Sequence, residues 1–175
     1  MSSFLRLPSA NKLRQMVDDQ IRLLAFQQTL EQEVQGSKYV GLSINETIHA
    51  CIVRGNGKKA DKLRADWKVP DKRSVRHYPL SEWSLTKGRW WYIKLKSLIE
   101  LRDWDALETF AKSKKSPIGY EPFVDLLVAT GSSRQALNFV QRCETKNRAD
   151  LYVKCSDWVA AGQECVKRTD RTKLL

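Results

Sequence analysis

Apolar residues recur along almost the whole chain at the three- and four-residue spacing of α-helices rather than in the alternation of strands. From Ser9 to about Gln35 there is no glycine or proline, which predicts one long helix. Two apolar stripes mark this helix, so it has two faces to bury, either against neighbouring helices or against a partner protein. The first stripe is Leu13, Val17, Ile21 and Leu24, and the second is Met16, Leu23, Phe26 or Gln27, Leu30 and Val34.

The next segment, SINETIHACIVRG, predicts a capped helix. Ser43 and Glu46 have the S-x-x-E spacing of a capping box, in which each side chain accepts a hydrogen bond from a backbone N–H of the other. Gly55 can end the helix. One face is apolar and predicts contact with the core: Ile44, Ile48, Cys51 and Ile52.

A repeat follows, in which four short helices each begin at a residue type that caps helices. These residues are Asn56, Asp103, Ser132 and Asp157. Four positions on, a small or apolar residue would let another helix approach closely: Ala60, Leu107, Ala136 and Ala161. Seven positions on stand Leu63, Phe110, Phe139 and, breaking the pattern, Glu164.

The helix starts lie 47, 29 and 25 residues apart, so the first interval is too long for one period. Removing Ser74–Gly88, which has no clean amphipathic pattern, shortens it to about 32 residues. A period near 30 residues with two helices each predicts an all-α fold, an α-solenoid of stacked antiparallel helical hairpins. We therefore predict a single domain over residues 1–175, with Ser74–Gly88 as an inserted loop.

The segment KSKKSPIGYEPFVDLL predicts a hinge between two helices. The helix that starts at Asp103 ends in lysines, which suit the negative end of its dipole, and Pro117 forbids further helix. Gly119 permits a tight reversal, and Pro122 fits the first turn of the next helix. Its core residues are predicted to be Phe123, Leu126 and Leu127.

The charge of the chain narrows the range of partners. There are 31 Lys and Arg against 20 Asp and Glu, a net charge of +11, which favours an acidic partner or simply keeps a helical surface in solution. No apolar run is long enough to span a membrane, and the N-terminus lacks the apolar core of a secretory signal. Four cysteines without CxxC pairing indicate packed thiols in a reducing compartment: Cys51, Cys143, Cys155 and Cys165.

Sequence motifs for phosphate binding, metal binding or nucleophilic catalysis are weak or absent. GNGK at Gly55–Lys58 is not a phosphate-binding loop, the cysteine and histidine spacings match no zinc site, and no nucleophile motif occurs. We therefore predict no catalytic residue, metal or cofactor, and no enzyme activity. KVPDKR and RWWYIK combine cations with aromatic residues and leave a basic helical-repeat nucleic-acid-binding module as the alternative function. Core packing explains most of these aromatic residues, because they fall at helical intervals.

Four segments carry a family resemblance: MVDDQIRLL, VPDKR, WWYIKL and KSKKSPIGYEPFV. Together they resemble the C-terminal domain of the vacuolar protein sorting-associated protein 16 family, from about Lys12 to Val140. SKKSPIGY is the most specific of them, and beyond Val140 only the repeat pattern continues. Ser74–Gly88 interrupts the family pattern, and the family's large N-terminal propeller is not in this sequence, which indicates a fragment or short form.

The resemblance implies a scaffold in the class C core of the HOPS and CORVET tethering complexes. It would be cytoplasmic and peripheral on late endosome and lysosome or vacuole membranes. Its partners would be an SM-type subunit that regulates SNARE pairing and the other subunits of these complexes. We predict that the partner meets the second stripe of the first helix and the basic elbow Lys72–Arg73, although Asp71 could instead turn the chain and Arg73 pair internally. The predicted contact residues are Met16, Val17, Gln20, Asp71, Lys72 and Arg73.

Overall fold

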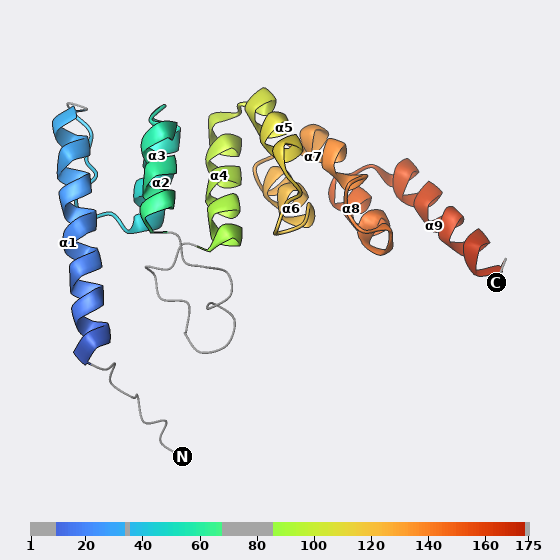
Figure 1. The fold of residues 1–175 in the computed structure, drawn as a ribbon. Coiled ribbons are helices and arrows are strands. Elements are labelled where there is room, and N and C mark those ends of the chain that lie inside the picture. Colours follow the sequence, from blue (N-terminus) through green and yellow to red (C-terminus); the bar gives the residue numbers. More distant parts are fainter. Residues whose placement is uncertain (1–9, 34–35, 68–85, 174–175) are drawn as a thin grey trace, which may run out of the picture. The chain divides into compact units, whose positions relative to one another are not determined.

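The computed structural model describes residues 10–33, 36–67 and 86–173, and all regular structure within these ranges is helical, as predicted (Figure 1). The chain divides into two compact units, Met1–Thr86 and Lys87–Leu175. Each unit has a core of its own. The single domain predicted over residues 1–175 stays a prediction.

The first unit contains α1 (Ala10–Glu33), α2 (Ile44–Val53) and α3 (Gly57–Asp66). The predicted capping box is present at the start of α2. The Ser43 hydroxyl accepts from the Glu46 N–H at 3.3 Å, and the Glu46 carboxylate accepts from the Ser43 N–H at 2.8 Å. Ile44, Ile48 and Cys51 are buried, so the predicted core face of α2 is confirmed at these residues.

A buried glutamine joins α1 to α2. Gln27 Nε2 donates to the Leu42 carbonyl and to the Thr47 hydroxyl, both at 2.7 Å, and Gln27 Oε1 accepts from the Gly41 N–H at 3.3 Å. Leu23 and Leu30 lie one turn to either side of Gln27 on the same face and are buried. This face therefore combines apolar packing with a polar group whose hydrogen bonds fix the register of α1.

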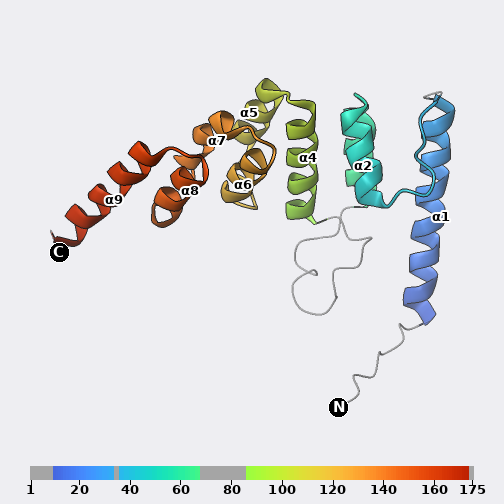
Figure 2. The same cartoon turned by 180° about the vertical axis from the view of Figure 1, so that it is seen from behind.

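The second unit contains α4 (Lys87–Leu101), α5 (Trp104–Ser113), α6 (Glu121–Ala129), α7 (Ser133–Val140), a short 3₁₀ turn (Thr145–Asn147), α8 (Arg148–Lys154) and α9 (Trp158–Lys173). Each helix contacts the next in the pairs α4–α5, α6–α7 and α8–α9, and α6 also contacts α4 and α8 (Figures 1 and 2). Rings pack between these helices, Trp91 on Phe110 at 4.1 Å and Phe123 on Phe139 at 5.2 Å between centroids.

Most of the predicted insertion, residues 74–85, lies outside the described residues. Its predicted end at Gly88 is wrong, because Lys87 and Gly88 already belong to α4. Gly88 therefore does not end the inserted loop but lies in the first turn of α4, and the helix begins earlier than this glycine suggested.

All four predicted helix starts are helix N-caps, and each follows a residue with a left-handed backbone. Gly55, Arg102, Gly131 and Ser156 have φ angles of 77°, 53°, 72° and 63°. Each is followed by a backbone N–H that donates to the carbonyl five residues earlier, as Asp103 does to Leu98 at 3.2 Å. Asp103 and Asp157 also cap through their side chains, whereas Asn56 and Ser132 do not. The small or apolar residues four positions on are all buried, as predicted: Ala60, Leu107, Ala136 and Ala161.

Replacing Arg102 by glycine is expected to stabilise the second unit, because glycine adopts a left-handed backbone without steric cost. We expect a gain of about 0.5–1 kcal/mol in the free energy of unfolding, after allowing for the greater freedom of glycine in the unfolded chain. Urea unfolding followed by circular dichroism measures it. Gly131→Ala is the reciprocal control and should lose about 1 kcal/mol, since it imposes a side chain on the same geometry. A loss of stability in Arg102→Gly would contradict this explanation.

The predicted hinge between α5 and α6 is confirmed, although α5 ends at Ser113, before the last two lysines. Gly119 has a φ of 74°, and Pro122 lies in the first turn of α6. The Tyr120 hydroxyl donates to the Ala111 carbonyl at 3.2 Å and holds the hinge against α5. Phe123 and Leu127 are buried as predicted, while Leu126 is partly exposed.

Candidate functional site

The N-terminal half of α1 exposes a strip of apolar side chains. Leu13, Val17 and Ile21 are 47%, 56% and 58% exposed and recur every four residues, so they lie on one face of the helix. Figures 1 and 2 both show this half of α1 extending past the ends of α2 and α3. We call these three residues the α1 strip.

The two stripes predicted for α1 differ in their burial. The second stripe, which we expected to be the contact face, packs internally at Leu23 and Leu30, so that expectation is wrong for these residues. The first stripe is exposed at Leu13, Val17 and Ile21, and Leu24 is partly exposed. The reason is Gln27, whose three hydrogen bonds to residues 41–47 rotate the second stripe toward α2.

The predicted contact residues on α1 lie beside or within the strip. Val17 is its central residue, Gln20 is exposed, and Met16 is partly exposed. Asp71, Lys72 and Arg73 lie outside the described residues, so their role stays a prediction. Leu13 and Ile21, which are exposed in line with Val17, were not among the predicted contact residues, although their spacing in the first stripe was visible in the sequence.

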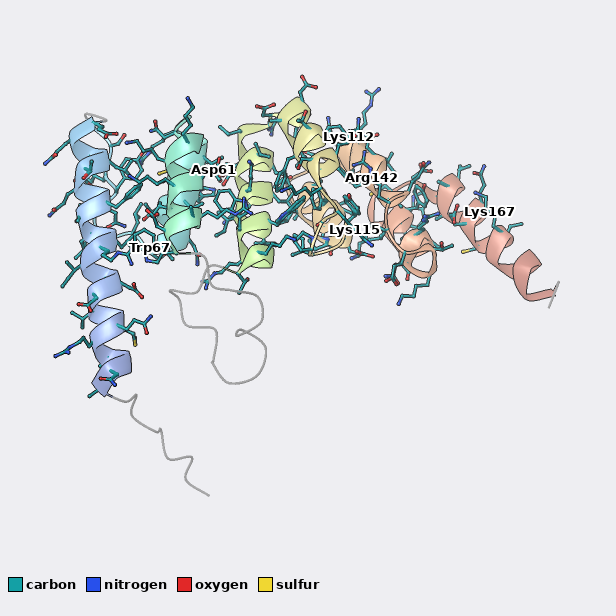
Figure 3. All side chains as sticks on the ribbon, in the orientation of Figure 1. Asp61, Trp67, Lys112, Lys115, Arg142 and Lys167 are labelled. Carbon is teal, nitrogen blue, oxygen red and sulfur yellow. The ribbon has the colours of Figure 1, made fainter. Side chains whose placement is uncertain are left out.

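Arg22 borders the strip and ties it to the end of α3. Its guanidinium lies 4.9 Å from the centroid of the Trp67 ring, and it pairs with Asp19 at 3.6 Å. Trp67, labelled in Figure 3, follows α3 directly and is buried. This contact joins the helix that carries the strip to the end of α3.

The second unit has an open groove of about 860 Å³ among α5, α7, α8 and α9. Glu108 on its wall pairs with Arg142 and, at 3.1 Å, with Lys112. Arg142 and Lys112 are labelled in Figure 3. Burial raises the pKa of the Glu108 carboxyl, but hydrogen bonds from Lys112 and Arg142 outweigh it and hold the pKa below its ordinary value. Across the groove Lys167 pairs with Glu164 at 2.9 Å. These charged side chains pair with one another, so the groove carries no excess of positive or negative charge.

Three of the four cysteines pack in the core, as predicted, and Cys165 is exposed instead. Burial raises the pKa of the Cys51 thiol to about 11 and that of Cys143 to about 12, so both thiols stay protonated and unreactive at neutral pH. Within the described ranges no three His, Cys, Asp or Glu residues come together in a way that could hold a metal ion. None of the helices described is both long and apolar enough to cross a membrane.

The aromatic residues of RWWYIK do not form a stacking platform. Trp90 and Trp91 are buried, and Lys94 lies over the rings of Trp90 and Phe110 at 5.8 and 5.0 Å. Only Tyr92 of this motif is an exposed ring. Bases stack on exposed rings, so this motif no longer favours the nucleic-acid alternative.

Comparison with known proteins points to one protein family. A family model described as "Vps16, C-terminal region" matches residues 9–175. The vacuolar protein sorting-associated protein 16 homolog of Dictyostelium discoideum is 40% identical over 126 residues, which cover 72% of this chain and 13% of that protein. The probable homolog of Schizosaccharomyces pombe is 33% identical over 153 residues, 85% of this chain and 16% of that protein. Protein VACUOLELESS1 of Arabidopsis thaliana is 30% identical over 159 residues, 90% of this chain and 17% of that protein. The chain thus spans less than a fifth of the length of these relatives.

Proposed function

The chain belongs to the family of Vps16 C-terminal regions, and from this premise we propose that it is a non-catalytic scaffold of an endosomal or vacuolar (lysosomal) membrane-tethering complex. Under this proposal it binds and positions an SM-type subunit that regulates SNARE pairing, beside the other subunits of a HOPS- or CORVET-type assembly. It meets the membrane only through that assembly. The names of the relatives, which refer to vacuolar protein sorting, support the cellular process.

We further propose that the helix pairs are stacked as an α-solenoid. The order of contacts in the second unit supports this, since pairs that follow one another in sequence also contact one another, α4 with α6 and α6 with α8. A lone pair of short helices buries too little apolar surface to offset its ordering entropy, and stacking supplies the missing burial. Such arrays offer long surfaces to partner proteins.

The α1 strip is the observation that carries the binding role. Protein interfaces depend on a few apolar anchors at their centre with polar groups around them. Leu13, Val17 and Ile21 supply three anchors in one line, and Gln20 supplies a polar group beside them. A helix face of this kind suits a partner with a complementary apolar groove.

Replacing Val17 by aspartate is expected to weaken binding of the SM-type subunit by about ten- to hundredfold, or 1.4–2.8 kcal/mol, because the carboxylate would lose water at the centre of the interface. Isothermal titration with the purified SM-type subunit measures the affinity. Thr29→Asp is the matched control, since Thr29 is exposed on another side of the same helix. Equal loss in both variants would contradict a contact centred on the strip.

The broader proposal is tested by co-purification of the whole chain with the SM-type subunit, with and without residues 74–85. A stable one-to-one complex is the expected result. Failure of both forms to bind the SM-type subunit would overturn the proposed function, whereas binding that Val17→Asp leaves unchanged would overturn only the proposed surface.

A further inference from the structure

Positive charge without any acidic residue gathers in two segments of the second unit. Residues 86–99 and 109–120 contain no Asp or Glu. Their cations are Lys87, Arg89, Lys94, Lys96, Lys112, Lys114 and Lys115. The net charge of +11 favours an acidic partner but does not say which surface that partner meets. The composition of these two segments points to the pair of helices α4 and α5.

The fold brings the two acid-free segments together. Only Arg102 and Asp103 lie between α4 and α5, and the two helices contact each other, so the start of α4 lies toward the end of α5. A Cβ atom at Gly88 would meet the Ile118 Cγ2 atom at 3.3 Å, which places the first turn of α4 against the hinge that follows α5. Lysines far apart in the sequence therefore lie at one end of this helix pair.

Four exposed lysines at this end form what we call the basic edge: Lys87, Lys112, Lys114 and Lys115. Lys112 pairs with Glu108 at 3.1 Å. The other three lysines have no ion-pair partner within the residues that the structure describes. The basic edge therefore carries positive charge that its own unit does not balance.

The acidic residues of the neighbouring helix α6, which contacts α4, are engaged elsewhere. Asp125 pairs with Lys154 of α8 at 2.6 Å. The Glu121 carboxylate accepts hydrogen bonds from the backbone N–H groups of Tyr120 and Glu144, which hold the pKa of its carboxyl below the ordinary value. Both carboxylates thus have partners outside the basic edge, and neither neutralises its lysines.

The surroundings of the basic edge favour one class of anion. Trp90 and Trp91 are buried and offer no ring on which a nucleic-acid base could stack. No large apolar side chain is exposed from residue 102 to residue 120, all of which the structure describes, so none is available to enter a lipid surface beside the lysines. Carboxylates of a protein remain, and the flexible stem and compact charge of lysine suit carboxylates at several positions.

We propose that the basic edge binds a short acidic segment of a partner protein, one in which several Asp or Glu residues lie close together. Complementary charge attracts the segment, and its carboxylates pair with the exposed ammonium groups of the edge. Association is sensitive to salt, because exposed charges are screened. The basic edge belongs to the second unit and the α1 strip to the first, so this contact is additional to the one proposed for the SM-type subunit.

Fluorescence anisotropy of a labelled peptide of alternating Glu and Ser, titrated with the whole chain, tests the proposal. The peptide should bind, and a peptide of alternating Gln and Ser should not. Replacing both Lys114 and Lys115 by Glu should weaken binding about tenfold or more. The matched control replaces Lys58 and Lys62 of α3, which are also exposed, and changes the net charge equally. Absence of binding, or equal weakening in the two double variants, would overturn the proposal.

A second comparison tests whether both segments contribute to one site. Lys87→Glu should weaken binding of the acidic peptide, whereas Lys96→Glu should have a smaller effect, since Lys96 is exposed nine positions on, about half a turn around α4. Equal loss in both would contradict the proposed edge. Vesicles with phosphatidylserine and a single-stranded oligonucleotide serve as competing ligands. If either bound more tightly than the peptide and lost binding in the Lys114 and Lys115 variant, the edge would belong to that ligand and the proposal would fail.

Discussion

Replacing Phe123 by alanine is expected to lower the free energy of unfolding of the second unit by about 3–5 kcal/mol, a large part of the stability of a domain this size. Phe123 is fully buried, and its ring packs on Phe139 at 5.2 Å and on Tyr120 at 5.4 Å. It therefore joins α6 to α7 and to the hinge before α6. Alanine would remove this apolar burial and leave a cavity, since the surrounding helices collapse only partly.

Urea unfolding followed by far-ultraviolet circular dichroism measures the effect, and hydrogen exchange locates it within residues 87–173. Leu126→Ala is the matched control on the same helix, where the side chain is partly exposed, and should cost less than about 1.5 kcal/mol. A Phe123→Ala variant as stable as the control would show that α6 does not depend on this contact.

Replacing Gln27 by methionine is expected to release α1 from α2 at a cost of about 2–4 kcal/mol. Methionine keeps the length of the side chain but cannot replace its hydrogen bonds, and the Thr47 hydroxyl and the Leu42 carbonyl would lose a buried donor. Because the same face of α1 fixes where the α1 strip points, the variant should, under the proposed function, also weaken binding of the SM-type subunit.

Hydrogen exchange of the α1 amides measures the release, and titration with the SM-type subunit measures the loss of binding. Gln28→Met is the matched control, since Gln28 is the next residue, is exposed, and should change stability by less than about 0.5 kcal/mol. If α1 of the Gln27→Met variant exchanged as slowly as in the control, the hydrogen bonds of Gln27 would not hold the helix.

Much of the local structure follows from neighbouring residues and could be predicted. The capping box at Ser43 and Glu46, the N-caps Asp103 and Asp157, and the hinge at Gly119 all depend on contacts within a few positions. Capping hydrogen bonds and the backbone freedom of glycine act directly on the neighbouring backbone. Left-handed turns at Arg102 and Ser156 were not predictable in the same way, because a non-glycine residue adopts them only when the packed helices on both sides require it.

The candidate site could be predicted only in part. The two stripes of α1 were visible as spacing, but which of them is buried depends on Gln27, a polar residue whose partners lie fourteen to twenty residues away. Cys165 was predicted to pack and is exposed, while Glu164 interrupts the apolar repeat and is buried. In α1 the side that faces the core is set by hydrogen bonds that join distant segments, whereas in α9 Glu164 pairs with Lys167, three residues along the same helix.

The sequence by itself determined that the chain is helical, where most of its helices begin, and to which family it belongs, because spacing, capping residues and motifs are written in short segments. Only the tertiary structure decided which apolar faces stay exposed, such as the α1 strip and the side of α9 that carries Trp158, Val159 and Val166. The physical reason is that periodicity defines the faces of a helix, whereas burial depends on which neighbour satisfies the polar groups on each face.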